Sequence, residues 1–192
     1  SLQKEIDRAL KSIWLNEIQQ DYMENCPLKE DSLKCAIYYH LRNELEEILK
    51  ENDLRIYPEF YIPEVKYRAD LAIVRIDPQK EKTWLKDMVT DIAVIMELKY
   101  TSGTDDATIN WVKNDLWKFK DYLYSAHLSE CQFYFAALYE SDCEWLNWLD
   151  ARSTNRWAKG RVTELVSGFI GEDMCFEVHS YNGMNKSLNA NK

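Results

Sequence analysis

Several kinds of pattern are missing from this 192-residue sequence, and each absence narrows the range of possible functions. No apolar run approaches the roughly 20 residues that a helix needs to cross a bilayer, so we expect a soluble protein with no membrane partner. The five cysteines are odd in number, widely spread and without a CxxC pair, which favours reduced thiols over a disulfide framework or zinc knuckle. The three histidines form no HExxH spacing or other ligand spacing, so they predict no metal site by themselves.

Positive charges are outnumbered by negative ones. There are 24 Lys and Arg residues against 33 Asp and Glu residues, which gives a formal net charge of -9. A protein that coats nucleic acid draws its affinity from Lys and Arg, so this balance disfavours such a protein. The overall charge does not exclude a local basic groove. An acidic excess is also expected of a protein that binds a metal ion through carboxylates.

The length and the hydrophobic fraction of 46% predict one domain over residues 1–181. The remaining stretch, 182–192 (NGMNKSLNANK), is biased in composition and predicts a disordered tail. The chain opens on Ser1 without a basic-then-apolar leader. We therefore expect a processed or artificial first residue, no secretion and a cytoplasmic location.

Apolar periodicity predicts the order of the elements. Helical spacing predicts four helices, at residues 2–23, 31–50 (capped by Asp31 or Ser32), 105–126 and 144–166. Alternating or continuous apolar runs predict five strands, at residues 54–62, 67–76, 91–100, 131–139 and 174–181. The resulting order, ααβββαβαβ, is typical of an α/β or α+β domain with a central mixed β-sheet flanked by helices.

The strand DIAVIMELKY (residues 91–100) is apolar until it reaches Glu97-Leu98-Lys99. Strand alternation places Glu97 and Lys99 on one face, and Asp70 opens the apolar run of the preceding strand, within reach of Glu97 if the two strands are neighbours. Two close carboxylates repel each other unless a cation or a proton lies between them. Mg²⁺ takes one or two carboxylates and leaves positions for phosphate. These side chains therefore suit metal-assisted attack of water on a phosphodiester, with Lys99 stabilising the developing charge.

These residues resemble the motif of the PD-(D/E)xK nuclease superfamily, which includes restriction endonucleases, Holliday-junction resolvases and RecB-type nucleases. The resemblance covers residues 31–139: a helix, a hairpin carrying Ala69-Asp70, the strand ending in Glu97-Leu98-Lys99, a helix and a strand. Ala69 stands where the motif's name has proline. The resemblance implies a restriction endonuclease-like αβββαβ core that cleaves nucleic acid, DNA rather than RNA, with Mg²⁺ or with Mn²⁺ as a substitute. It makes Asp70, Glu97 and the Leu98 carbonyl metal ligands, and Lys99 the catalytic lysine.

Other residues are candidates for the same site. Many members of the superfamily add a glutamate from a helix, and Glu44 is the candidate here, as a catalytic residue and metal ligand, because it falls in the gap of an apolar stripe. Glu59 would lie opposite Asp70 across the hairpin and is a candidate ligand. A solvated face is the alternative for both. For nucleic-acid contacts, the candidates are Lys118, Arg156, Trp157 and Lys159, with ordinary helical surface charge as the alternative.

Three functions are compatible with the sequence. The first is a Mg²⁺-dependent nuclease of defence, repair or a mobile element, as a homodimer or part of a larger complex. The second is a catalytically inactive module of the same fold that binds nucleic acid or a protein partner. The third is an acidic structural or partner-binding domain in which Glu97-Leu98-Lys99 is an incidental surface ion pair.

Overall fold

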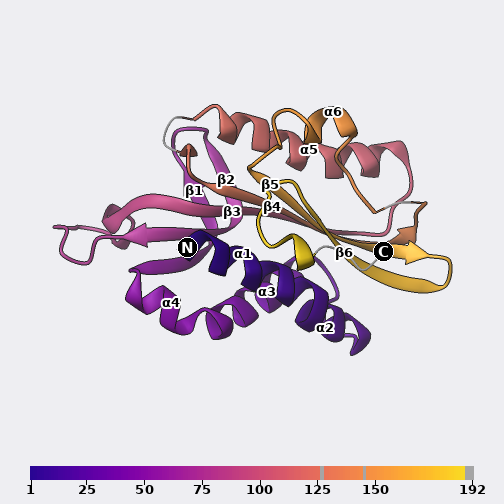
Figure 1. Cartoon of the computed structure of the whole chain (residues 1–192), viewed down its shortest axis with the longest axis horizontal. Coiled ribbons are helices and arrows are strands. Elements are labelled where there is room, and N and C mark those ends of the chain that lie inside the picture. The colour runs from indigo at the N-terminus through magenta and orange to yellow at the C-terminus, as the bar shows by residue number, and fades with distance from the viewer. Residues whose placement is uncertain (126–127, 145, 189–192) are drawn as a thin grey trace.

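The computed structural model describes residues 1–125, 128–144 and 146–188, and it places helices on both faces of one β-sheet (Figure 1). The described residues thus form the α/β arrangement that the sequence predicts. The predicted helix 105–126 ends close to its expected limit, although Ala126 itself lies outside the described residues. No helix in this part of the chain is long and apolar enough to cross a membrane.

The sheet follows the chain in strict order, from β1 to β6. Its strands are β1 (Leu54–Ile62), β2 (Tyr67–Ile76), β3 (Val89–Thr101), β4 (Gln132–Asp142), β5 (Val162–Ile170) and β6 (Asp173–Ser180). The pairs β3–β4 and β4–β5 are parallel, and the other neighbours are antiparallel. The sheet is therefore mixed, as predicted, with the parallel strands at its centre.

One face of the sheet is covered by the N-terminal helices, and the other by the two later ones (Figure 1). The first layer contains α1 (Leu2–Ile13), a π-helical turn (Trp14–Ile18), α2 (Gln19–Met23), α3 (Glu30–Glu44) and α4 (Glu46–Glu51). The second contains α5 (Asp106–Leu123) and α6 (Ala151–Thr154). Short 3-10 turns occupy Leu85–Met88 and Lys186–Leu188.

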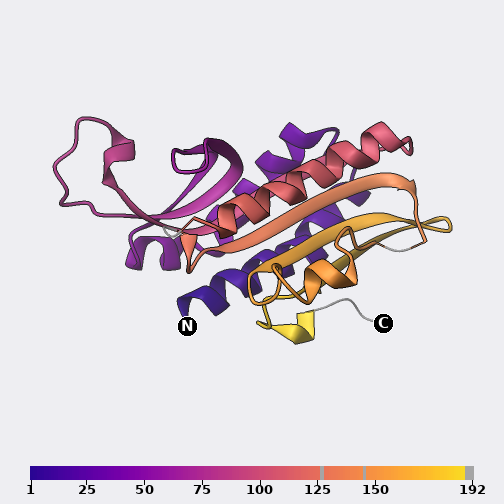
Figure 2. The same ribbon diagram turned by 90° about the horizontal axis from the view of Figure 1, so that it is seen from above.

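Strand alternation in β3 decides which side chains meet which layer. Met96 and Leu98 are buried in the cluster that contains α1 and α3, whereas Ile95 is buried with the apolar stripe of α5. Glu97 and Lys99 share the face of Ile95, so they point towards α5. Asp105 caps this helix by accepting a hydrogen bond from the Thr108 N–H at 2.9 Å. Figure 2 shows α5 lying lengthwise over the sheet.

The predicted helix at residues 144–166 is wrong. Only Ala151–Thr154 is helical, as α6, and the chain then enters β5. This strand is buried from Val162 to Gly168, pairs with β4 and β6, and is rich in β-branched residues. Because β5 is buried on both faces, its sequence (VTELVSGFI) shows no regular alternation of apolar and polar residues, so local periodicity does not distinguish it from a helix. Trp145, within the same predicted helix, lies outside the described residues.

The tail predicted to be disordered is ordered in its described part, because residues 182–188 dock on α1. Asp7 and Lys11 form a 2.8 Å ion pair that is completely buried. Lys11 Nζ donates to the Met184 carbonyl at 2.6 Å, and the side-chain amides of Asn182 and Asn185 each donate to the Asp7 carboxylate at 2.8 Å. The polar residues whose composition predicted disorder instead provide hydrogen-bond partners for a buried charge pair. Residues 189–192 lie outside the described residues.

We expect Asp7→Asn to lower the free energy of unfolding by about 3 to 5 kcal/mol, because it leaves the Lys11 ammonium buried without its counter-charge. Denaturant unfolding of the two proteins measures this difference. The matched control is Glu46→Gln, which removes the acid of another i,i+4 ion pair. In that pair, the side chain of Glu46 is 64% exposed and that of Lys50 is 70% exposed. That change should have little effect. Equal losses in both variants would contradict the role given to burial.

Candidate active site

The ladder between β2 and β3 stops at Leu71 and Met96, and the candidate site begins there. Continued pairing would set Asp70 opposite Glu97. Instead, one carboxylate oxygen of Asp70 accepts a hydrogen bond from the Leu98 N–H at 2.7 Å. The Asp70 side chain thus takes the place of a backbone acceptor where the strands separate. It also lies close to Glu97, and its negative charge helps to raise the pKa of Glu97.

Lys99 is held from both helical layers. Its Nζ lies 2.5 Å from a carboxylate oxygen of Asp115 on α5 and 3.5 Å from one of Glu30 on α3. It also lies 3.9 Å from the centre of the Trp111 ring. Lys99 is 6% exposed, so these partners replace most of the water around its charge. Two carboxylates and an aromatic face therefore fix the position of the ammonium group.

Glu97 is the most buried acid of the group, at 1% exposure. The Tyr122 hydroxyl donates to one of its oxygens at 2.9 Å, and Lys118 Nζ lies 3.5 Å from the other. Burial above all, and then the charge of Asp70, raises the pKa of Glu97 to about 8, against the opposing influence of Lys118. The raised pKa favours the protonated carboxyl group over the carboxylate in the metal-free protein.

Two more lysines complete the arrangement. Lys118 Nζ lies 2.6 Å from Asp115, and Lys34 Nζ lies 3.7 Å from Asp70 and also contacts Glu59. The carboxylate–lysine cluster is made up of Glu30, Lys34, Asp70, Glu97, Lys99, Asp115 and Lys118. With Glu97 protonated, its formal charges balance as three carboxylates against three ammonium groups. Burial also raises the pKa of Asp70 and that of Glu30. Nearby lysine charges oppose this rise in both acids, and the hydrogen bond from the Leu98 N–H opposes it in Asp70.

The structure brings Asp70, Glu97 and Lys99 close together, as the sequence predicts, but Glu97 and Lys99 are almost fully buried rather than facing a space open to solvent. Glu59 lies opposite Asp70 at a gap in the β1–β2 ladder, and it reaches the edge of the cluster through Lys34. Its backbone has a positive φ of 53°, and its side chain is 49% exposed.

Glu44 does not reach the site. It is exposed at the last position of α3, about 21 Å along the helix axis from Glu30, which is the acid that this helix brings to Lys99. The apolar stripe shows which side of a helix faces the sheet, but not which end lies over the strand opening.

The structure also adds residues that sequence reasoning missed. Glu30, Lys34 and Asp115 were not predicted, although Asp115 carries a signal: it interrupts the apolar stripe of α5, three residues after Val112 and directly before Leu116. An acid inside such a stripe needs a buried partner.

The predicted nucleic-acid contacts are divided between two places. Lys118 is half-buried in the cluster, where it pairs with Asp115. Arg156 and Lys159 are exposed in the segment after α6, and Trp157 packs on Trp117 with ring centres 6.3 Å apart. Lys120 Nζ lies over both of these rings, at 3.8 Å from the centre of Trp117 and 5.5 Å from that of Trp157. This aromatic group is separate from the carboxylate–lysine cluster.

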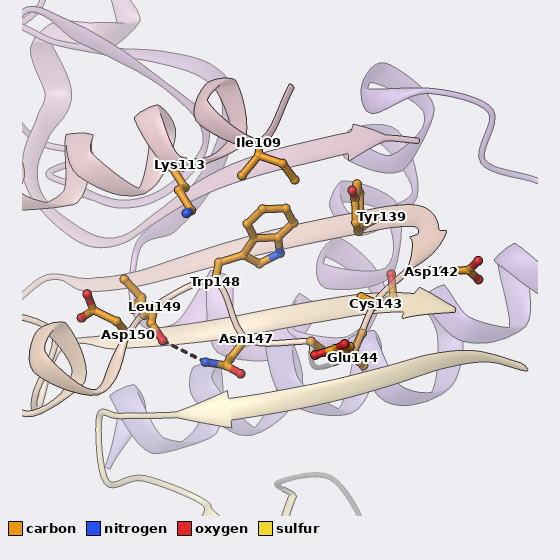
Figure 3. Close-up of a pocket in the computed structure, with 12 residues that line it drawn as sticks. Ile109, Lys113, Tyr139, Asp142, Cys143, Glu144, Asn147, Trp148, Leu149 and Asp150 are labelled. Atoms are coloured by element: carbon orange, nitrogen blue, oxygen red, sulfur yellow. Dashed lines mark hydrogen bonds between the residues drawn. The ribbon is translucent and has the colours of Figure 1, made fainter. Parts of the chain in front are cut away.

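A cavity of about 540 Å³ lies on the other flank of α5. Figure 3 shows Ile109 and Lys113 pointing from the helix towards Trp148. Trp148 and Leu149 belong to a loop that borders the cavity. Beneath this loop, the buried Glu164 carboxylate accepts hydrogen bonds from the Trp148 N–H at 2.6 Å and the Leu149 N–H at 3.2 Å. No residue of the carboxylate–lysine cluster lines the cavity, and the acid beneath it is used in holding the loop. The cluster is the stronger candidate for chemistry.

The donor set of the cluster consists of oxygen atoms. Among the described residues, no three His, Cys, Asp or Glu side chains are arranged to hold a metal ion. Asp70 and Glu97 nevertheless supply two adjacent carboxylates, and Mg²⁺ is usually bound by one or two carboxylates together with water and substrate phosphate. The pair therefore fits Mg²⁺ or Mn²⁺, and the absence of nitrogen and sulfur ligands disfavours Zn²⁺ at the pair.

Comparisons with known proteins give no assignment, since no protein-family model, curated protein or solved structure matches the chain. The geometry of the cluster is therefore the main indication of a function.

Glu97 should make the stability of the metal-free protein fall as pH rises. Its folded pKa of about 8 lies above the ordinary value of 4.5, so the native state holds this proton more tightly than the unfolded state. Its contribution is complete below about pH 4.5 and is lost as pH rises towards about 8. Glu97→Gln cannot titrate, so it should be relatively more stable than the wild type by about 1.4 kcal/mol for each pH unit in that window.

Urea unfolding at pH 5, 7 and 9, with EDTA present, measures this slope. The exposed Glu44→Gln variant is the control and should run parallel to the wild type. Parallel curves for Glu97→Gln as well would show that Glu97 does not titrate in this window.

Proposed function

We propose that the protein is a Mg²⁺-dependent nuclease that hydrolyses phosphodiester bonds of nucleic acid, DNA in preference to RNA. The observation that carries the proposal is the meeting of Asp70, Glu97 and Lys99 where β2 and β3 separate. The order α3-α4-β1-β2-β3-α5-β4, in which the short α4 directly follows α3, is compatible with the αβββαβ core that the resemblance to PD-(D/E)xK nucleases implies. A restriction endonuclease-like core is part of this proposal.

Asp70 and Glu97 would hold the cation, with the Leu98 carbonyl as the predicted third ligand. When bound, Mg²⁺ would neutralise charge on the phosphoryl oxygens and lower the pKa of a coordinated water molecule. The Tyr122 hydroxyl and Lys118 orient the Glu97 carboxyl group, since they contact its two oxygens separately. These contacts fix the acid in place before a cation arrives.

Lys99 supplies the charge that the transition state needs. A phosphodiester gains negative charge on its oxygens as water attacks, and an ammonium group fixed nearby stabilises that charge without reorganising. Asp115 and Glu30 position Lys99 from opposite layers of the fold. These two acids act through Lys99, so they are positioning residues rather than catalytic ones.

One observation favours the inactive binding module as a second candidate. The charges of the cluster are mutually satisfied, and Glu97 and Lys99 are almost fully buried. An arrangement of this kind also stabilises a fold without performing chemistry. Cleavage assays separate the two candidates, because only the nuclease turns over its substrate.

Lys99→Ala should reduce the hydrolysis rate by about 100-fold or more, because the lost interaction acts mainly in the transition state. It should leave Mn²⁺ binding nearly unchanged. Asp70→Asn should weaken Mn²⁺ binding and hydrolysis together. The assay incubates wild type and both variants with single-stranded, duplex and branched DNA and with RNA, in Mg²⁺ and in Mn²⁺, and calorimetry follows the metal. Equal cleavage by wild type and Lys99→Ala would assign the activity to a contaminant or to another site.

The two ends of α3 provide a second comparison. Glu30→Gln should slow hydrolysis by about tenfold, because Lys99 loses one of the groups that fix its position. Glu44→Gln changes the same residue type on the same helix, far from the cluster, and should leave the rate unchanged. If Glu44→Gln were the slower of the two variants, the assignment of the cluster would be wrong.

A further inference from the structure

We propose that the candidate active site takes an unpaired nucleic-acid strand, one base of which stacks on Trp111. This inference rests on the proposed nuclease function and names its substrate class. It depends on three features: the position of Trp111, the charge balance around the cluster and the burial of the reactive groups.

Trp111 lies on α5 beside the cluster. Its ring centre is 3.9 Å from Lys99 Nζ, and the side chain is 46% exposed. The ammonium contact fixes the ring from the protein side, while nearly half of the residue stays open to solvent. Lys99 Nζ lies over one face of the ring, which leaves the opposite face for a base of a nearby nucleotide, and bases of every kind stack on an exposed indole.

The charge balance favours stacking over phosphate contacts as the source of affinity. Duplex binding depends on several Lys or Arg residues spaced along the phosphate backbone. The lysines of the cluster are each paired with a carboxylate, and the chain as a whole carries a net charge of -9. Stacking needs no net positive charge, so an unpaired strand can gain affinity here that a duplex, with its bases already stacked, cannot.

Burial limits the shape of the substrate. Glu97 is 1% exposed and Lys99 is 6% exposed, between the N-terminal end of α3 and the flank of α5. A phosphate that reaches them must leave the bulk of its polymer outside. A single strand is flexible enough to present one phosphate while turning its base aside, whereas a duplex holds its phosphates on a wide and stiff cylinder. The recessed site therefore suits the unpaired strand.

The same helix offers a matched control in Trp117. It is also 46% exposed and also carries a lysine on its ring, with Lys120 Nζ 3.8 Å from the ring centre. It lies six residues after Trp111, which places it about 240° further around the helix. It packs on Trp157 rather than beside the cluster. The two tryptophans thus differ in location but match in exposure and in local chemistry.

The test is a binding measurement without divalent cations, so that it does not depend on cleavage. Fluorescence anisotropy would be followed with labelled 20-nucleotide single strands of mixed sequence, as DNA and as RNA, and with a duplex of the same length. Wild type should bind at least one of the two single strands, DNA or RNA, more tightly than it binds the duplex. Trp111→Ala should weaken single-strand binding by about tenfold, whereas Trp111→Phe should keep most of it and Trp117→Ala should leave it unchanged. If Trp111→Ala fails to fold, Trp111→Leu replaces it.

Three results would overturn the inference: a duplex bound as tightly as the single strands, unchanged affinity in Trp111→Ala, or a loss confined to Trp117→Ala. The third would move the stacking surface to the Trp117 and Trp157 group. Cleavage in Mg²⁺ or Mn²⁺ is then tested separately. Single-strand binding through Trp111 without any cleavage would remove the nuclease proposal and leave the binding site. Equal cleavage of all substrates by wild type and Trp111→Ala would keep the nuclease proposal and remove the role of Trp111 in binding an unpaired strand.

Discussion

The hydrogen bond from the Leu98 N–H to the Asp70 carboxylate is the contact on which the candidate site depends. In a continuous ladder, a carbonyl of the neighbouring strand would accept this bond, and β2 would stay against β3 along its whole length. A side chain accepts it instead, so the backbone donor is satisfied while the strands part. The buried acid Glu97 then faces the opening and the α5 helix. Removing the carboxylate would leave a backbone donor without its acceptor as well as removing a charge, so structure and proposed chemistry depend on the same atoms.

The sequence predicts the centre of this site well because strand alternation is a strong rule. A strand that ends in Glu97-Leu98-Lys99 must present both charges on one face, and a neighbouring strand with Asp70 at its start must bring that acid close. The mixed sheet and most element boundaries follow from the same periodicity. The roles of these residues as metal ligands and as catalyst stay predictions, because geometry alone does not establish a reaction.

Other parts of the fold are set by long-range packing that local patterns do not contain. Whether Glu30 or Glu44 meets Lys99 depends on which end of α3 crosses the strand opening. The strand β5 is predicted as a helix because a helical layer covers each of its faces, so its sequence lacks the alternation that marks a half-buried strand. Asp115 could have been found, since a carboxylate in an apolar stripe indicates a buried cation, yet its partner comes from another element. The docking of Asn182 and Asn185 depends on the buried charges of Asp7 and Lys11, which lie at the other end of the chain.

This last arrangement has a consequence for how the chain acquires its structure. Two of the hydrogen bonds that satisfy the buried Lys11 can form only when Ser180 and Met184 are present to accept them. On a growing chain, these acceptors for Lys11 are therefore among the last of the described residues to appear. Contacts between residues so far apart in sequence also slow folding, because the intervening chain has to be ordered first. The polar residues 182–185 thus complete the hydrogen bonding of a buried charge pair that lies on α1, far earlier in the chain.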